Sequence, residues 1–312
     1  MTRATSLVRT PRIDPGIAAL VAAMVIWGVT MVITKSVLEE VGPFTLLAGR
    51  FALAFALLGP VAARRGFRLS MVIRPTFIAF GITGIVLHNG LETVGLMFTS
   101  AGSGALVIAA APALTAALSV VFLKESVTRL QIAGIVLSIL GVAMVTNAGI
   151  GGVGSTEILG NLLVFGGVIS WAVYTVQGKR LVVDLPAIVT TTAGIGAATM
   201  ILIPMAITEV AVTGVPSVSM SGFLGIVYLG ALASALAYAL WNSALNHVDA
   251  SVAAPYVNLV PVIGLLAALL IGEPTNAMQL AGGAVVGLGI WLSEAGRVRR
   301  DREARLPAEM AV

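Results

Sequence analysis

The sequence predicts an all-α integral membrane protein whose ten transmembrane helices form two inverted five-helix repeats. Three observations lead to this fold class. The chain is 58% hydrophobic and only 10% charged, whereas about a quarter of the residues in a soluble domain are charged. Its apolar residues fall into runs of about 20, the length at which a helix crosses the hydrocarbon core of a bilayer. Residues also recur in register between the two halves of the chain.

The composition excludes several other classes of protein. The chain has no cysteine, so disulfides and thiolate metal sites are excluded. Its pI of about 9.8 would indicate nucleic-acid binding if the basic residues lay on one soluble face. They lie instead in short loops between apolar runs, which predicts a lipid bilayer as partner and no nucleic acid. The chain has no GxxxxGK[ST] motif, and we expect no cofactor.

Short linkers that hold glycine, proline or charge separate the expected helices. The first helix runs from Gly16 to about Ser36, longer than the core of a cleaved signal peptide, so we expect it to be retained. The ten helices are expected over residues 16–36, 43–63, 75–97, 101–123, 128–147, 158–179, 186–208, 221–244, 250–271 and 277–295. The expected regions are an N-tail (1–15), a first repeat (16–147), a linker (148–157), a second repeat (158–295) and a basic C-tail (296–312).

The charges predict the orientation of these helices. If the N-terminus is cytoplasmic, all of the 18 basic residues except Lys35 and Arg50 fall on the cytoplasmic side. This asymmetry predicts that both termini are cytoplasmic, and it supports an even number of helices. The expected outer loops hold acidic residues instead, namely Glu39, Glu40, Glu157, Glu209 and Glu273.

The two halves repeat each other in register. The chain has four tryptophans, and two of them pair in this way, which chance does not readily explain. Because each half has an odd number of helices, the second half enters the membrane from the opposite side, an arrangement in which carriers often place their site between the halves. Gly16, Trp27 and Lys35 recur 144 residues later, Ala101, Ala105 and Pro112 recur 149 later, and Glu125, Gln131, Ala133, Gly134 and Gly141 recur 148 later.

Two prolines, Pro112 and Pro261, fall at corresponding positions inside the helices expected over 101–123 and 250–271. Each removes a backbone hydrogen bond, so we expect each helix to kink. The kinks could bend the helices around a cavity or could serve packing alone, and the sequence leaves both interpretations open.

These features together resemble a known family. Residues 25–51, "VIWGVTMVITKSVLEEVGPFTLLAGRF", resemble the start of an EamA-type repeat of the drug/metabolite transporter superfamily. Residues 100–145 resemble its end, and residues 160–182 and 249–292 resemble a second copy. The resemblance implies a ten-helix carrier in the bacterial inner membrane that exports small metabolites such as amino acids. It does not identify the substrate.

Three ionisable residues stand out inside the expected helices, where a charge costs about 2.5–3.5 kcal/mol. His88 and Glu92 are four residues apart and share a helix face, while Asn89 is expected to be rotated away from them. Arg50 lies at a depth where it could meet Glu92. Two interpretations stay open. Glu92 could be a proton site or a substrate-amine site tuned by His88 and Arg50, or a fixed Arg50–Glu92 pair could lock two helices together.

Aromatic and amide residues form a second candidate group. Trp27 and Trp171 lie too deep for the interfacial belt of a membrane protein, and Tyr174 follows Trp171 by one helical turn. Such residues can line an amphipathic cavity for a small organic solute, although ordinary packing is the alternative for each. The other members expected at this site are Tyr238, Tyr256 and Asn258, and the same group holds Gln177, Trp241 and Asn242.

Three further features have a simpler expectation. Trp241 and Trp291 lie near inner helix ends, where anchoring at the interface explains them. The small residues of "SAGSGA" (100–105) could expose backbone N–H groups to a carboxylate, but close packing is the simpler explanation.

The sequence therefore predicts a secondary carrier that exports neutral or zwitterionic metabolites, amino acids or similar, in a proton-linked cycle of alternating access. A small-drug efflux carrier and a facilitative metabolite transporter are alternatives. An intramembrane metalloenzyme is a remote one, since no HExxH motif accompanies His88 and Glu92. Phosphate-bearing cargo is disfavoured because only Arg50, Lys35 and Lys179 could supply positive charge. The sequence leaves open whether the protein forms a homodimer.

Overall fold

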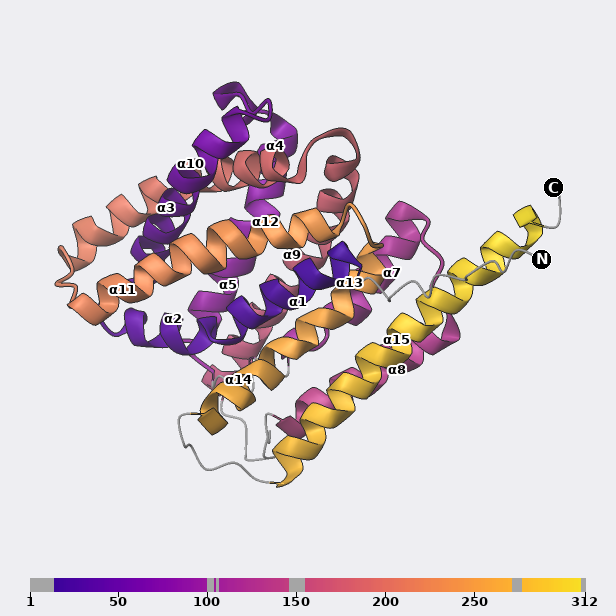
Figure 1. Cartoon of the computed structure of the whole chain (residues 1–312). Coiled ribbons are helices and arrows are strands. Elements are labelled where there is room, and N and C mark those ends of the chain that lie inside the picture. The colour runs from indigo at the N-terminus through magenta and orange to yellow at the C-terminus, as the bar shows by residue number, and fades with distance from the viewer. Residues whose placement is uncertain (1–13, 100–103, 105–106, 146–154, 271–276, 310–312) are drawn as a thin grey trace, which may run out of the picture.

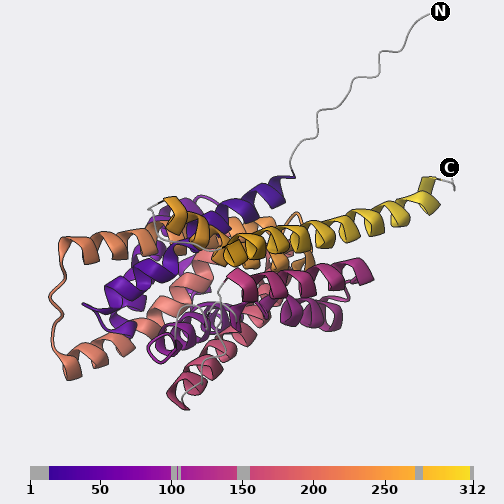
Figure 2. The ribbon, with the colours of Figure 1, turned by 90° about the horizontal axis from the view of Figure 1, so that it is seen from below.

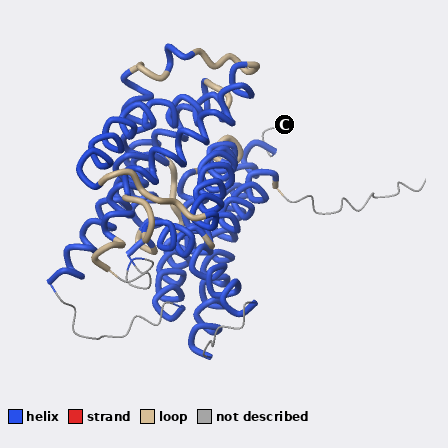
Figure 3. The backbone as a smooth tube through the Cα atoms, turned by 90° about the vertical axis from the view of Figure 1, so that its left-hand side faces the viewer, coloured by secondary structure: helices blue, strands red, loops and turns tan. Residues whose placement is uncertain are grey.

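The computed structural model describes residues 14–99, 104, 107–145, 155–270 and 277–309. Within these ranges the chain forms helices and connecting loops and has no strand (Figures 1 and 3). Several features expected from the sequence lie outside the described residues: the N-tail before Asp14, most of "SAGSGA", most of the linker, and Glu273.

The helices of the first half follow the expected segments. They are α1 (Pro15–Gly28), α2 (Thr30–Leu38), α3 (Pro43–Ala63), a short 3₁₀ turn (Leu69–Met71), α4 (Pro75–Gly81), the π-helical η2 (Ile82–Leu87), α5 (His88–Gly95), α7 (Ala111–Leu123) and α8 (Arg129–Val145).

The second half likewise has one helix pair interrupted by a π-helical element, but it begins with a single continuous helix. Its elements are α9 (Ser155–Asp184), α10 (Ala187–Thr213), α11 (Met220–Tyr228), the π-helical η3 (Leu229–Leu236), α12 (Ala237–Ala244), α13 (Ala250–Ala253), the 3₁₀ turn η4 (Ala254–Asn258), α14 (Leu259–Leu270) and α15 (Ala277–Glu309).

The fold is that of a multi-pass membrane protein. Three shorter apolar helices accompany six helical stretches that are long and apolar enough to span a bilayer. The count of ten crossings stays a prediction. The six long stretches are Pro15–Leu38, Pro43–Ala63, Pro75–Gly95, Thr156–Asp184, Ala187–Thr213 and Met220–Ala244.

The two halves interleave rather than form separate bundles. The most extensive helix contacts pair an element of the first half with one of the second: α8 with α15, α3 with α10, α5 with α9 and α1 with α12 (Figures 1 and 2). Any space at the centre is therefore bounded by both halves.

Glycine allows the α8–α15 pair to pack at backbone distance. A Cβ atom on Gly289 would lie 2.6 Å from both the carbonyl oxygen of Gly134 and the backbone nitrogen of Ser138. Such close approach is a common way to associate helices in lipid, where the hydrophobic effect between helices is absent.

The two ends of the bundle are easily told apart. We call the end that holds Asp14, Asp184 and Asp249 the terminal side, because α1 begins there and α15 runs toward it. The other end, which holds Glu40 and Ser219, is the far side.

Carboxylates from distant helices cap helix starts at both ends. On the far side, Glu209 accepts hydrogen bonds from the backbone nitrogen and the hydroxyl of Thr45 at 2.7 and 2.6 Å. On the terminal side, Glu125 accepts from the backbone nitrogen of Ala250 at 3.0 Å and from Ser251 Oγ at 2.7 Å. These carboxylates satisfy donors that a helix start leaves unpaired, and their charge suits its dipole.

Helix interruptions fall at matching places in the two halves. Pro112 lies in the first turn of α7, directly after a break at residues 109–110, and Pro261 lies in the first turn of α14, directly after η4. The prolines thus begin helices, where the missing N–H costs little, rather than bend continuous ones as expected. The π-helical elements η2 and η3 interrupt the helices over 75–95 and 220–244, and the sequence analysis did not foresee them.

Candidate functional site

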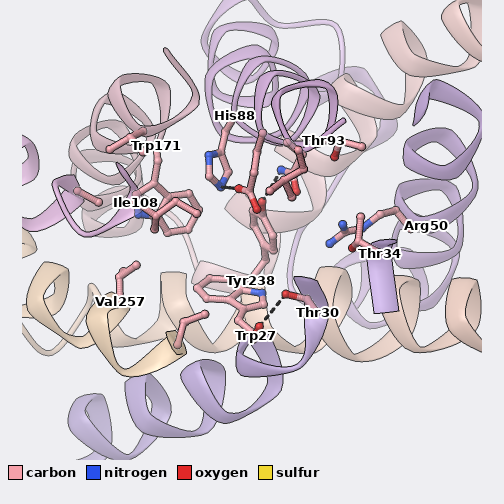
Figure 4. Close-up of a pocket in the computed structure, with 16 residues that line it drawn as sticks. Trp27, Thr30, Thr34, Arg50, His88, Thr93, Ile108, Trp171, Tyr238 and Val257 are labelled. Carbon is pink, nitrogen blue, oxygen red and sulfur yellow. Dashed lines mark hydrogen bonds and ion pairs between the residues drawn. The ribbon is translucent and has the colours of Figure 1, made fainter. Parts of the chain in front are cut away.

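A cavity lies between the two halves at the centre of the bundle (Figure 4). Its empty space, including the part that opens outward, is about 820 Å³. Six of the residues expected at the site line it, and they come from both halves: Trp27, Arg50, His88, Glu92, Trp171 and Tyr238.

Three residues expected at the site do not line the cavity. Tyr174 is buried beneath it and Asn258 donates a hydrogen bond to Ser138 Oγ at 3.0 Å. Tyr256 is also buried, and its neighbour Val257 lines the cavity in its place.

Aromatic rings form one wall of the cavity, which we call the aromatic floor: Trp27, Trp171 and Tyr238, with Trp241 buried behind them. The Trp27 and Trp171 centroids are 5.5 Å apart, and Tyr238 lies 5.5 Å from Trp27. Trp241 is fully buried and lies 5.1 Å from Trp171, so its expected position in the interfacial belt is wrong. Trp291 is 64% exposed on α15, and its anchoring role stays a prediction.

The π-helical elements connect the floor to both halves. A π-helical turn displaces the usual hydrogen-bond ladder and makes carbonyls available to side chains. Trp27 Nε1 donates to the carbonyl of Ala233 in η3 at 2.9 Å. Tyr238 donates its hydroxyl hydrogen to the carbonyl of Gly84 in η2 at 3.1 Å. Each tie joins an aromatic residue of one half to the interrupted helix of the other.

Asn89 is the functional candidate that the sequence analysis missed. It lines the cavity, and its Nδ2 donates to the Tyr238 hydroxyl at 2.8 Å. The cavity touches α5 at His88, Asn89, Glu92 and Thr93, an arc of about 140° at about 100° per residue. The expectation that Asn89 is rotated away assumed a narrower face.

The geometry of His88 defines where a proton can bind. His88 Nδ1 lies 3.1 Å from the carbonyl oxygen of Gly167, and because a carbonyl only accepts, Nδ1 is the donor. In the neutral ring Nε2 is then an acceptor, and it lies 3.6 Å from Glu92 Oε2. A neutral His88 beside an ionised Glu92 therefore places two acceptors opposite each other. One added proton converts this pair into an attractive one.

Arg50 lies on the cavity wall formed by α3 and does not pair with Glu92. Its side chain is buried, and its Nε donates to Ser234 Oγ in η3 at 2.8 Å. Among the described residues there is no Arg50–Glu92 contact within ion-pair distance, so the fixed pair considered as an alternative is absent.

The other candidate cations lie elsewhere. Lys35 is exposed on α2. Lys179 Nζ donates to the carbonyls of Leu245 and Val248, both at 2.7 Å, at the end of α12. In the described part of the chain, no group of three or more His, Cys, Asp or Glu residues could hold a metal ion.

Buried side chains close the cavity toward the terminal side. Tyr174 stacks on Phe80 with centroids 4.3 Å apart. Asn242 Nδ2 donates to the Tyr174 hydroxyl at 2.7 Å and to Thr191 Oγ1 at 3.0 Å, which joins α12 to α9 and α10. The cavity extends the other way, along Thr30 and Thr34 of helices α1–α2 toward the far side.

Comparison with known proteins agrees with this architecture. The EamA-like transporter family matches the chain twice, over residues 14–147 and again over residues 158–294. The chain belongs to the EamA-like transporter family. It is therefore a multi-pass membrane transporter rather than an enzyme, and its partners are a small solute and the lipid bilayer.

Relatives of this EamA-like transporter match it over nearly their whole length. The uncharacterized transporter YyaM of Bacillus subtilis is 32% identical over 87% of this chain and 90% of its own. A probable amino-acid metabolite efflux pump of Salmonella typhimurium is 29% identical over 93% and 97% of the two chains. A probable terminal-alkyne amino-acid exporter of Streptantibioticus cattleyicolor is 27% identical over 95% and 99%.

A solved crystal structure supports the fold of this EamA-like transporter. It superposes with a TM-score of 0.76, covering 89% of this chain and 96% of that one, at 21% identity. At this identity the likeness concerns the fold alone.

Proposed function

We propose that this EamA-like transporter is a proton-linked secondary carrier that exports small neutral or zwitterionic metabolites, amino acids or similar, by alternating access. We further propose that it acts in the bacterial inner membrane with both termini in the cytoplasm. The names of relatives at 27–29% identity support an amino-acid cargo. The cavity supports it through its chemistry, because a cation, a carboxylate and aromatic rings face one small space.

The observation on which the proposal rests is the facing acceptor pair of His88 and Glu92 in that space. Without a bound proton the two acceptors repel each other, and with one they attract each other. A pair of this kind can couple proton binding to solute binding. The closed terminal side supports alternating access, since the cavity is then reached from one side at a time.

The test uses purified protein in liposomes with a panel of radiolabelled neutral amino acids and a trapped pH-sensitive dye. Wild type should move at least one of them faster when a pH gradient is applied. Glu92→Gln should lose the effect of the gradient on whatever solute exchange is left, because the amide cannot take up the proton. The matched control is Glu39→Gln, the same change at an exposed residue outside the cavity, which should behave as wild type.

Two outcomes would contradict the proposal. Wild-type flux that is indifferent to the pH gradient would indicate a facilitative transporter. Movement of lipophilic cationic dyes with no movement of any amino acid would indicate small-drug efflux.

A further inference from the structure

One buried group in the cavity has more hydrogen-bond donors than the protein satisfies. The Arg50 side chain is only 6% exposed. A guanidinium carries five N–H donors and stays charged. The structure uses the one on Nε, which donates to Ser234 Oγ, while the N–H groups on Nη1 and Nη2 have no hydrogen-bond partner among the described residues. A charge buried with unpaired donors is costly unless something compensates it.

No carboxylate of the described chain lies within ion-pair distance of this charge, whose guanidinium carbon lies 4.9 Å from the centroid of the Phe51 ring. Glu92 shares the cavity with Arg50 but is not in ion-pair contact with it. Two acidic residues on the far side already have partners, since Glu209 accepts from Thr45 and Glu40 accepts from Ser219. The remaining surface of the guanidinium faces the cavity, where Figure 4 shows it extending inward beside Thr34.

The hydrogen bond to Ser234 decides which edge of Arg50 is available. Because Nε is engaged by η3, the N–H groups on Nη1 and Nη2 are the ones left for a solute in the cavity. Two parallel N–H groups fit the two oxygens of a carboxylate. Ser234 is fully buried, so it holds the guanidinium in this orientation.

The rest of the cavity narrows the class of ligand. Glu92 is a second, opposite charge in the same space, and it would repel a dianion such as a phosphate ester. A molecule with one carboxylate and one ammonium group matches both charges, and its side chain can then lie on the aromatic floor of Trp27 and Trp171.

We infer that Arg50 is the carboxylate-binding residue of the transport cavity, that Ser234 positions it, and that Glu92 receives the ammonium group of the same zwitterion. This inference rests on the proposed function and assigns the two ends of its solute.

The test measures binding by the quenching of tryptophan fluorescence, because two tryptophans line the cavity. The probes are alanine, leucine and phenylalanine, each compared with its carboxamide, which lacks the carboxylate, and with its des-amino acid, which lacks the ammonium. Wild type should bind the amino acid about tenfold or more tightly than the carboxamide, because the carboxylate makes charge-assisted hydrogen bonds that the carboxamide cannot make.

The variants separate the roles of the residues. Arg50→Gln should bring the ratio of the affinity for the amino acid to the affinity for the carboxamide close to one, because it weakens binding of the amino acid and not binding of the carboxamide. Arg50→Lys should be intermediate, since an ammonium cannot make the two parallel bonds. Ser234→Ala should reduce this affinity ratio about threefold and leave the affinity for the carboxamide unchanged. This variant keeps the test valid if Arg50→Gln does not fold. Lys35→Gln removes a positive charge at an exposed site on α2 and should change nothing.

The outcomes distinguish this inference from the proposed function. If wild type binds no member of the panel, the proposed amino-acid cargo fails, and this inference fails with it. If wild type binds an amino acid but binds its carboxamide equally well, or if both Arg50→Gln and Ser234→Ala keep the full preference, Arg50 is not the carboxylate site and the proposed function stands.

Discussion

Removing one buried amide should open the closed side of the cavity. Asn242 joins α12 to α9 through Tyr174 and to α10 through Thr191, with donor–acceptor distances of 2.7 and 3.0 Å. Both bonds cross between helices that must separate if the terminal side is to open. Asn242→Ala deletes both. At about 0.5–1.5 kcal/mol for each bond, the closed state loses about 1–3 kcal/mol.

This loss converts to a shift in population. About 1–3 kcal/mol corresponds to an increase of about fivefold to about 150-fold in the ratio of terminal-open to terminal-closed molecules. The assay uses Val168→Cys, a cavity-lining position in a chain that has no native cysteine. A charged thiol reagent applied from the terminal side should label this cysteine faster in the Asn242→Ala background, in proportion to the shift.

The control is Thr208→Ala, an exposed threonine on α10 whose hydroxyl bonds only to Pro204 in its own helix. It should leave the labelling rate unchanged. Unchanged terminal-side labelling in Asn242→Ala, in protein that still folds and is labelled from the far side, would refute the interpretation of this hydrogen-bonded group as the closed gate.

Two further predictions concern the scaffold. Gly289→Leu should lower the free energy of unfolding by about 1–3 kcal/mol, because its side chain meets backbone atoms of α8, while Gly287→Leu, with open space around it, should not; equal thermal shifts for the two variants would contradict the backbone contact. Hydrogen bonds from Ser219 lower the pKa of Glu40 below its ordinary value of 4.5. This contact therefore stabilises the fold when the pH is above 4.5, and the stabilisation is lost as the pH falls through the lowered pKa. The thermal-stability difference between wild type and Glu40→Gln should therefore disappear in acid, and a difference that grows there would contradict this sign.

The sequence was sufficient to predict the architecture, because the hydropathy of a segment shows whether lipid or water surrounds it. Apolar run length predicted the helical segments, and the paired tryptophans predicted that two related halves meet at the centre, where Trp27 and Trp171 are in contact. The scarcity of ionisable residues at membrane depth predicted which charges share the cavity. Arg50, His88 and Glu92 all line it.

The finer placement of side chains depends on packing that the sequence does not encode locally. The π-helical elements form in runs with no proline, and the one glycine in each, Gly84 and Gly230, does not stand out in a chain with 35 glycines. Asn89 and Trp241 were misplaced for a related reason: their positions depend on how wide a face α5 presents and on which helices cover α12. Tyr174 and Asn258 find buried hydrogen-bond partners on neighbouring helices, and only the tertiary structure supplies those partners.

The central claim is that the space between the two halves is reached from one side at a time. It is tested most directly by electron-spin distances between paired labels at two positions on each side of the cysteine-free chain. On the far side the labels would be at Ser36 and Met97, and on the terminal side at Thr76 and His247, all exposed. A change of pH with bound amino acid should lengthen one distance while it shortens the other. Distances that stay fixed, or that lengthen together, would contradict alternating access.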